Sequence, residues 1–175
     1  MEIFTERLHL REMRADDFDA LYAVLGDSDN MRHYPHAFEE ETVQGWIEKN
    51  LERYRIFGFG LWAVCLKENG RLIGDCGLTM QNINGSIRPE IGYHIRRDMQ
   101  RQGYAKEAAC AVRDMAFENT PFRVLYSYMK HDNVPSAKTA VSYGAHFFKS
   151  YEDDECLTDV YAITREEWQN MKNEE

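Results

Sequence analysis

The chain has 175 residues, of which 43% are hydrophobic and 13% aromatic, and this suits one compact domain with a sizeable core. Its formal net charge of −9 argues against nucleic-acid binding as the main role and suits a cationic partner, such as an amine or a basic peptide. The four cysteines lack paired or zinc-like spacing, and the sequence has neither an apolar leader nor a run long enough to span a membrane. The cytoplasm is therefore the simplest compartment.

The first half of the chain alternates between strand-like and helix-like hydrophobic patterns. In chain order, the predicted elements are an edge-type strand over 5–13, a helix from Asp16 or Asp17 to Gly26, a polar loop over 27–37, a helix with apolar positions from Val43 to Tyr54, and strands over 59–66 and 72–80. The last two strands are joined by a turn that contains Asn69-Gly70, which is a strong short-range signal for a hairpin.

The second half continues the alternation after a loop that contains Asn82, Asn84 and Gly85. The remaining predicted elements are a strand over 90–95, a helix over 105–117, a strand over 122–129, a helix from Pro135 to Tyr143, two strands over 146–151 and 156–163 around an acidic tip at 152–155, and a short helix from Arg165. This order predicts one α/β (α+β) domain over residues 1–175, with a mixed sheet of six or seven strands and helices on its faces.

A basic, glycine-containing turn lies between the strand at 90–95 and the helix at 105–117. It carries Arg96, Arg97 and Arg101, and its Gly103 lets the backbone approach a ligand closely. The first turn of a helix presents unpaired N–H groups, so this turn is a candidate anion site. An ordinary connection with solvated arginines is equally consistent with this stretch alone.

Four segments in the right order resemble the GNAT superfamily of N-acetyltransferases. Residues 100–105, QRQGYA, match that family's central [RQ]-x-x-G-x-[GA] signature. The chain also resembles the RimJ/RimL-like branch, which acetylates ribosomal-protein N-termini, through TERLHLR at 5–11, MRHY at 31–34 with the later Trp46-Ile47, and NVPS at 133–136 followed by Gly144. The resemblance implies a GNAT-like fold, with a mostly antiparallel sheet that splays between its central strands.

The resemblance also implies acetyl-CoA as the donor and no metal. By position, the residues that would hold the pyrophosphate at the helix start are Arg101, Gln102, Gly103, Tyr104, Ala105 and Lys106. The pantetheine arm would pair with the strand end at Tyr93, His94 and Ile95. Asn133 is expected at the mouth of the splay, where it binds the pantetheine or orders a water and so counts among the catalytic residues. Lys138 is a further candidate for contact with a CoA phosphate.

Amine attack on a thioester needs a base for the amine and an acid for the departing thiolate. Glu90 is the candidate base, because the branch that this chain resembles has a glutamate there that works through water. The alternative is a strand-end carboxylate that pairs with Arg88. Ser136 is the candidate acid, with an ordinary helix cap as its alternative. The tyrosine acid of many GNAT enzymes falls at Ala140, and Tyr143 is offset and expected to face elsewhere, so a tyrosine mechanism is weakened.

The acceptor is the least readable part of the sequence, because loops form its pocket. His33, Tyr34 and His36 are candidates for shaping that pocket, with a polar surface loop as the alternative. The predicted activity is acetyl transfer from acetyl-CoA to a protein N-terminus or a small amine, by direct attack while both substrates are bound. The enzyme would act as a monomer or homodimer without nucleic acid or membrane. A CoA-binding module without catalysis is the alternative.

Overall fold

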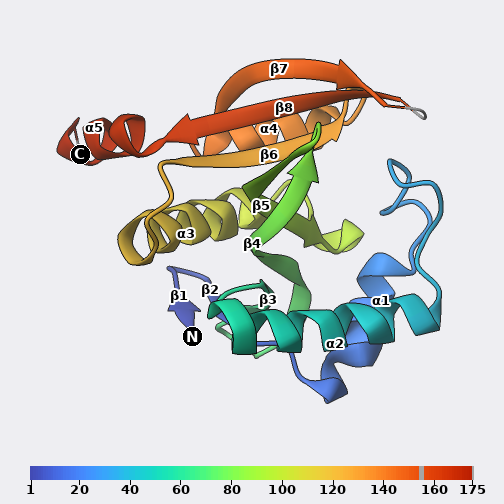
Figure 1. The fold of residues 1–175 in the computed structure, drawn as a ribbon. Coiled ribbons are helices and arrows are strands. Elements are labelled where there is room, and N and C mark those ends of the chain that lie inside the picture. Colours follow the sequence, from blue (N-terminus) through green and yellow to red (C-terminus); the bar gives the residue numbers. More distant parts are fainter. Residues whose placement is uncertain (154–155, 175) are drawn as a thin grey trace.

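The computed structural model describes residues 1–153 and 156–174. Within them the chain forms a single sheet and five α-helices (Figure 1). The strands are β1 (Ile3–Phe4), β2 (Leu8–Arg11), β3 (Leu61–Leu66), β4 (Leu72–Ile83), β5 (Ser86–Ile95), β6 (Val124–Lys130), β7 (His146–Glu152) and β8 (Leu157–Thr164). The helices are α1 (Phe18–Leu25), α2 (Glu40–Phe57), α3 (Tyr104–Asn119), α4 (Val134–Ser142) and α5 (Arg165–Glu174). None of these described helices is long and apolar enough to cross a membrane.

The sheet has the strand order β1-β2-β3-β4-β5-β6-β8-β7. Every neighbouring pair is antiparallel except β5 and β6, which run parallel and share one register pair, Glu90 with Tyr126. Beyond that pair β5 continues to Ile95 in register with β4 alone. The predicted mixed sheet and its central splay are confirmed, and the backbone of β5 after Glu90 has an open edge toward β6.

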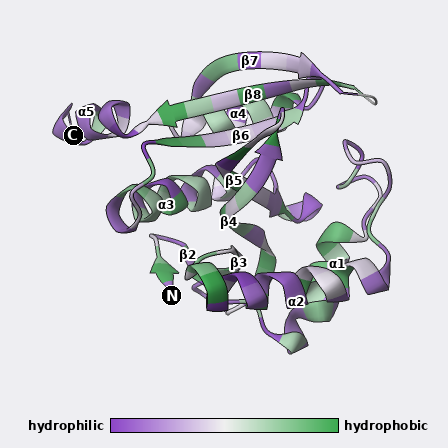
Figure 2. Ribbon diagram, in the orientation of Figure 1, coloured by the Kyte–Doolittle hydropathy of each residue, from purple (hydrophilic) through white to green (hydrophobic). Residues whose placement is uncertain are grey.

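Helices cover both faces of the sheet. Successive side chains of a strand point to opposite faces, so neighbouring residues of β5 meet different helices. His94 of β5 shares a face with Asp75 of β4, which α2 contacts through Trp46. The neighbouring Tyr93 points to the other face, where its hydroxyl donates to the carbonyl of Ser136 in α4 at 2.7 Å. Hydrophobic residues dominate α1, whereas α5 is largely hydrophilic (Figure 2).

Two elements differ from the sequence prediction. An eighth strand, β1, has only two residues and pairs with β2, so it is too short to leave an alternating pattern. The stretch at 81–89, expected as a loop, belongs to a hairpin of β4 and β5 that turns at Asn84-Gly85. Both turn residues have positive φ, 49° and 78°, which is the geometry of a tight hairpin turn. Residues 154 and 155 of the expected acidic tip lie outside the described residues.

Asn50 joins α2 to the start of β3 in the core. It is fully buried, its Oδ1 accepts from the Leu61 N–H at 3.0 Å, and its amide donates to the Trp46 carbonyl at 2.9 Å. We expect Asn50→Ala to lower the free energy of unfolding by about 1–3 kcal/mol, because the Leu61 N–H loses its partner. Urea denaturation followed by circular dichroism measures this. The exposed Asn170 in α5 supplies the control, and Asn170→Ala should leave the midpoint unchanged.

Candidate active site

Glu90 lies at the only paired position between β5 and β6. It is half-buried, and its Oε2 accepts a hydrogen bond from the Thr79 hydroxyl of β4 at 3.0 Å. Burial raises the pKa of Glu90 to about 7, and the Thr79 hydrogen bond acts in the opposite direction with smaller effect. Arg88 instead donates to the Tyr126 hydroxyl at 2.5 Å and lies over that ring. Glu90 therefore has the properties of a base that works near neutral pH.

His94 lies on the same face of β5 as Glu90 and belongs to a chain of hydrogen bonds. Its Nδ1 is 2.8 Å from Asp75 Oδ1, and its Nε2 is 2.6 Å from the Tyr34 hydroxyl. The other Asp75 oxygen accepts from the Trp46 indole N–H at 2.8 Å. The imidazole of His94 thus faces the side of the sheet covered by α1 and α2, and only its backbone lies along the open edge of β5.

The turn before α3 has the backbone conformation of an anion cradle. Arg101 and Gly103 both have positive φ, 60° and 83°, and Gly103 is the N-cap residue of α3. The exposed part of the turn comprises Arg101, Gln102, Gly103 and Lys106, with Tyr104 and Ala105 half-buried beside them. The first N–H groups of α3 thus lie next to exposed cationic side chains, which fits a pyrophosphate.

Arg7 of the β1–β2 connection holds this turn in place, and the sequence analysis did not single it out. Its guanidinium donates to the Gln102 carbonyl at 2.9 Å and to Glu107 Oε2 at 2.7 Å, and it lies 4.3 Å from the centre of the Tyr104 ring. It also lies close to Gly103, where an added Cβ would come within 3.3 Å of Arg7 Nη2.

We expect Arg7→Ala to weaken CoA binding about tenfold, which corresponds to about 1.4 kcal/mol, because the turn loses its support. Isothermal titration calorimetry with CoA measures this. The matched control is the exposed Arg123, for which Arg123→Ala should bind CoA as the wild type does. Equal affinities of all three proteins would show that Arg7 does not organise the turn.

The splay between β5 and β6 is bridged by side chains on the α4 side of the sheet. The Ser127 hydroxyl of β6 donates to the Ile91 carbonyl at 2.6 Å and lies 2.8 Å from the Tyr143 hydroxyl. Ser136 of α4 donates through its hydroxyl to the Tyr93 hydroxyl at 3.3 Å. These contacts tie α4 to both strands at the point where they part.

Asn133 is the N-cap residue of α4, and its Oδ1 accepts from the Ser136 N–H at 3.2 Å. The capping role is therefore filled by Asn133, not by the Ser136 side chain. Lys138 is exposed on α4. Tyr143, expected to face elsewhere on the helix than the Ala140 position, follows the last turn of α4, is fully buried and points at β6.

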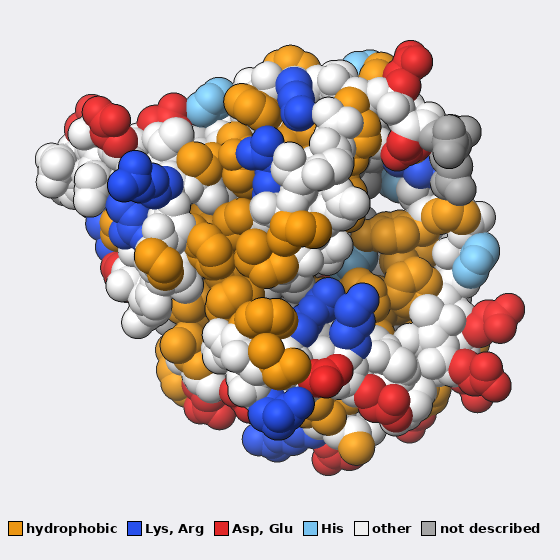
Figure 3. Space-filling model, in the orientation of Figure 1, with side chains coloured by type: hydrophobic (Ala, Val, Ile, Leu, Met, Phe, Trp, Pro, Cys, Tyr) orange, Lys and Arg blue, Asp and Glu red, His pale blue; other side chains and the backbone are white. Residues whose placement is uncertain are grey.

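The α1–α2 loop (residues 26–39) carries the three candidate acceptor residues. His33 Nδ1 lies 3.4 Å from Oδ1 of Asp132, which precedes α4. The Tyr34 hydroxyl contacts His94, whereas the His36 ring lies within hydrogen-bonding distance of the Ala37 carbonyl oxygen. The loop is also tied to the cradle turn, because Gln100 donates to Asn30 Oδ1 at 2.6 Å. Beside this loop the molecular surface is hollowed, with hydrophobic side chains around the hollow and a group of Lys and Arg below it (Figure 3).

The site residues that the sequence analysis missed are Asp75, Thr79, Trp46 and Arg7. Asp75 had a signal, since it is a charged residue inside the apolar run LIGDCGL. A charge in a buried strand needs a partner, and here it has two. Within the described residues no group of three or more His, Cys, Asp or Glu side chains could hold a metal ion.

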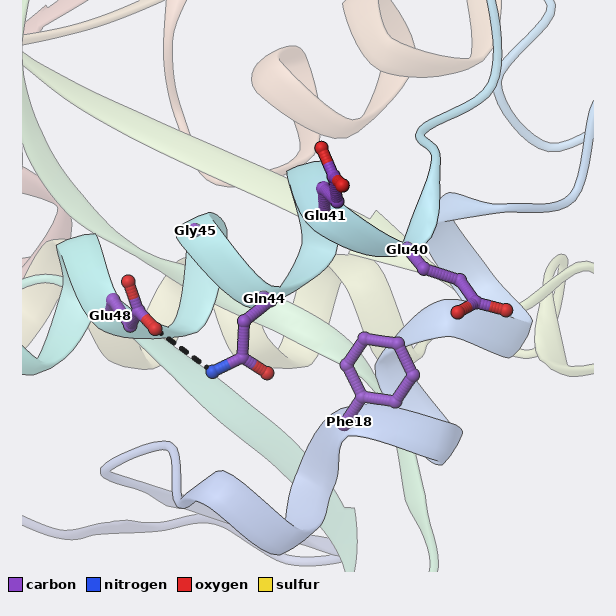
Figure 4. A pocket seen from close by; sticks show the side chains of 6 residues that line it. All are labelled: Phe18, Glu40, Glu41, Gln44, Gly45 and Glu48. Carbon is purple, nitrogen blue, oxygen red and sulfur yellow. Dashed lines mark hydrogen bonds between the residues drawn. The ribbon is translucent and has the colours of Figure 1, made fainter.

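A separate depression lies on the outer surface of α1 and α2 (Figure 4). Phe18 and the exposed polar side chains of α2 line it, and Gln44 there donates to Glu48 at 3.0 Å. It is open to solvent, and none of the residues discussed above lines it.

Comparison with known proteins identifies the class of this fold and site. The acetyltransferase (GNAT) domain family matches residues 7–146, so the chain belongs to the GNAT family of acetyltransferases. It is similar to the uncharacterized N-acetyltransferase YnaD of Bacillus subtilis (strain 168), with 29% identity over 179 residues, or 96% of this chain and 99% of YnaD. The protein is therefore an acetyl-CoA-dependent acyltransferase, and the family predicted from the sequence is confirmed.

Solved structures agree with this family. A GNAT-family acetyltransferase from Bacillus anthracis superposes with a TM-score of 0.80 and 25% identity, over 95% of this chain and 99% of that one. RimL, a ribosomal L7/L12 alpha-N-protein acetyltransferase in complex with coenzyme A, shares the fold with a TM-score of 0.78 and 17% identity, over 94% of this chain and 98% of that one.

Proposed function

We propose that the enzyme transfers the acetyl group of acetyl-CoA to a primary amine by direct attack while both substrates are bound, with the cytoplasm as its expected compartment. The observation that carries this proposal is Glu90, a carboxylate with a pKa near 7 at the point where β5 and β6 part. Free amines are mostly cationic near neutral pH, so the acceptor needs a base before it can attack. Glu90 removes that proton, directly or through one water.

The donor lies along the open edge of β5 in this proposal. The backbone of Tyr93, His94 and Ile95 pairs with the pantetheine arm, because β6 leaves that edge unpaired. The residues proposed for the pyrophosphate are Arg101, Gln102, Gly103, Tyr104, Ala105 and Lys106. Acetyl-CoA supplies the activated acyl group, and the protein supplies its position.

The residues of α4 complete the donor site. Asn133 caps α4 beside the splay and is proposed to position the pantetheine or a water. Lys138 is exposed on the same helix and is available for a CoA phosphate. Ser136, held at Tyr93, is one candidate for protonating the departing thiolate.

The acceptor is proposed to enter beside the α1–α2 loop, where His33 and Tyr34 lie. RimL acts on the N-terminus of a ribosomal protein, and a protein N-terminus is accordingly one acceptor class for this chain. A small amine is the other, since both classes present a primary amine to Glu90.

Thiol release from acetyl-CoA tests the proposal most simply. The wild-type enzyme should release CoA with at least one amine from a panel of basic N-terminal peptides, polyamines, amino acids and aminoglycosides. Mass spectrometry of the acceptor should show one added acetyl group. Tight CoA binding without turnover on any member of the panel would refute the enzyme and favour a CoA-binding module.

A further inference from the structure

The Asp75–His94–Tyr34 chain runs from the core to the surface beside Glu90. Asp75 is fully buried, His94 is 11% exposed and Tyr34 is 40% exposed, so the chain connects a buried carboxylate with a residue at the surface. An ionised carboxylate only accepts hydrogen bonds, so His94 Nδ1 carries a proton toward Asp75. The Trp46 indole occupies the other Asp75 oxygen and fixes the carboxylate in this orientation. His94 Nε2 is thereby directed at the Tyr34 hydroxyl.

Tyr34 lies over the point where β5 and β6 part. Burial raises the pKa of its hydroxyl above the ordinary value, and the nearby Glu90 on β5 and Tyr128 on β6 add to that rise. The preceding residue, His33, reaches Asp132 in the connection between β6 and α4. The Tyr34 hydroxyl is therefore placed at the splay, on the side of the sheet from which Glu90 also points.

The α4 side of the splay offers a weaker proton donor. The position of the tyrosine acid in many GNAT enzymes is Ala140, which has no hydroxyl and is fully buried. Tyr143 is also fully buried, and its hydroxyl lies at Ser127. The Ser136 hydroxyl donates to the hydroxyl of Tyr93, whose pKa burial raises well above its ordinary value.

We propose that Tyr34 is the residue that protonates the departing CoA thiolate, and that His94 and Asp75 are positioning residues that resupply its proton. This assignment rests on the proposed acetyl transfer to an amine. Tyr34 replaces the α4 tyrosine of other family members from a different element, the α1–α2 loop.

The step balances with the groups present. The ammonium form of the acceptor first loses one proton to Glu90, which passes it to solvent. The neutral amine nitrogen then forms a bond to the acetyl carbon, a second proton passes from nitrogen to Glu90, and the carbon–sulfur bond breaks with its electron pair on sulfur. The Tyr34 O–H proton passes to that sulfur, and the His94 Nε2 proton passes to the Tyr34 oxygen. Solvent then takes the proton from Glu90 and returns one to His94.

The charged groups around His94 favour the form that this step needs. Asp75 faces it from β4, Glu90 from β5 and Tyr34 from the loop, while α2 contributes the uncharged Trp46. Burial acts to lower the pKa of His94, but Asp75 and Glu90 outweigh it and raise the pKa from its ordinary 6.5. A protonated Nε2 donates to the Tyr34 oxygen, which leaves the Tyr34 O–H free to point at a substrate.

Kinetics at saturating acetyl-CoA and the best acceptor test the assignment. Tyr34→Phe should lower kcat about 100-fold, because the departing thiolate loses its proton donor. Tyr22→Phe on α1, a matched exposed tyrosine, should stay within about threefold of wild type. Ser136→Ala removes the competing candidate for the acid and should lower kcat less than Tyr34→Phe does. A kcat for Tyr34→Phe within threefold of wild type, or an equal loss for Ser136→Ala, would overturn it.

A titration of the substrate-free protein gives a second readout. Nitrogen-15 NMR of His94 should show a lower imidazole pKa in Tyr34→Phe, because the protonated Nε2 loses its acceptor. A raised or unchanged value would mean that Tyr34 donates to a neutral His94, and would refute the relay. No turnover by the wild type on any amine refutes the proposed function, whereas wild-type turnover with an unaffected Tyr34→Phe refutes only the proton donor.

Discussion

Glu90→Gln is expected to lower kcat by at least about 100-fold at pH 7.5 and to leave the affinity for CoA nearly unchanged. General-base catalysis contributes about 10²–10⁴-fold, and an amide cannot take the proton of the amine. Gln keeps the size of the side chain and can still accept from Thr79, so the loss isolates the base. Steady-state kinetics with a saturating acceptor and calorimetry with CoA measure the two quantities. An unchanged kcat would mean that another group is the base.

The same substitution has an expected effect on stability, which serves as its control. Because the folded state raises the pKa of Glu90 to about 7 from 4.5, ionising this carboxyl disfavours folding. The stability that the protonated carboxyl gives the folded state is fully present below pH 4.5, and it is lost as the pH rises through about 7. Glu90→Gln should therefore become more stable than wild type above pH 7 and match it near pH 4. Thermal melts at both pH values show whether the ionised carboxyl destabilises the folded state.

Gly77→Ala is expected to destabilise the protein by at least about 3 kcal/mol, with a fall in Tm of about 10 °C or more. Gly77 lies in β4 opposite Leu61 of β3. An added Cβ would lie 2.0 Å from the Gly60 carbonyl oxygen and 2.6 Å from the Leu61 Cα, and these are backbone atoms that cannot turn aside. The central sheet that carries Asp75 and Thr79 would have to shift. Differential scanning calorimetry and soluble yield measure the outcome.

Gly45 provides the opposite case within the same chain. It lies in the exposed middle of α2, and an added Cβ there meets nothing within 4 Å. Gly45→Ala should raise stability by about 0.5–1 kcal/mol, because alanine loses less backbone entropy in a helix.

For Gly77→Ala, a Tm equal to that of the wild type would show that β3 and β4 are not packed as closely as the structure has them.

The fold was largely predictable because its elements carry strong local patterns. Asn69-Gly70 predicted the β3–β4 hairpin, and Gly58 ended α2 close to the expected place. The turn at Asn84-Gly85 also contains an Asn-Gly pair, but polar residues surround it, and the sequence pattern therefore predicted a loop there instead of the β4–β5 hairpin. The expected sheet of six or seven strands lacked only β1, whose pairing with β2 depends on tertiary contacts rather than on its own two residues.

The candidate site was less predictable, because its contacts join distant segments. Glu90 was identifiable from the resemblance to the RimJ/RimL-like branch and from its expected place at the start of a strand. The structure places it inside β5, which begins four residues earlier at Ser86. Its partner Thr79 depends on the β4–β5 register, and that register depends on the unrecognised turn. Tyr34 was a candidate for acceptor binding, but its contact with His94 spans 60 residues and has no local signal.

The most direct test of the account is the pKa of Glu90 itself. Carbon-13 NMR of its side-chain carboxyl in the substrate-free enzyme should give about 7, and the plot of log kcat/KM against pH should break at the same value. That break should be absent in Glu90→Gln. A Glu90 carboxyl that titrates near 4.5, with a break near pH 7 that persists in Glu90→Gln, would contradict the assignment of Glu90 as the base.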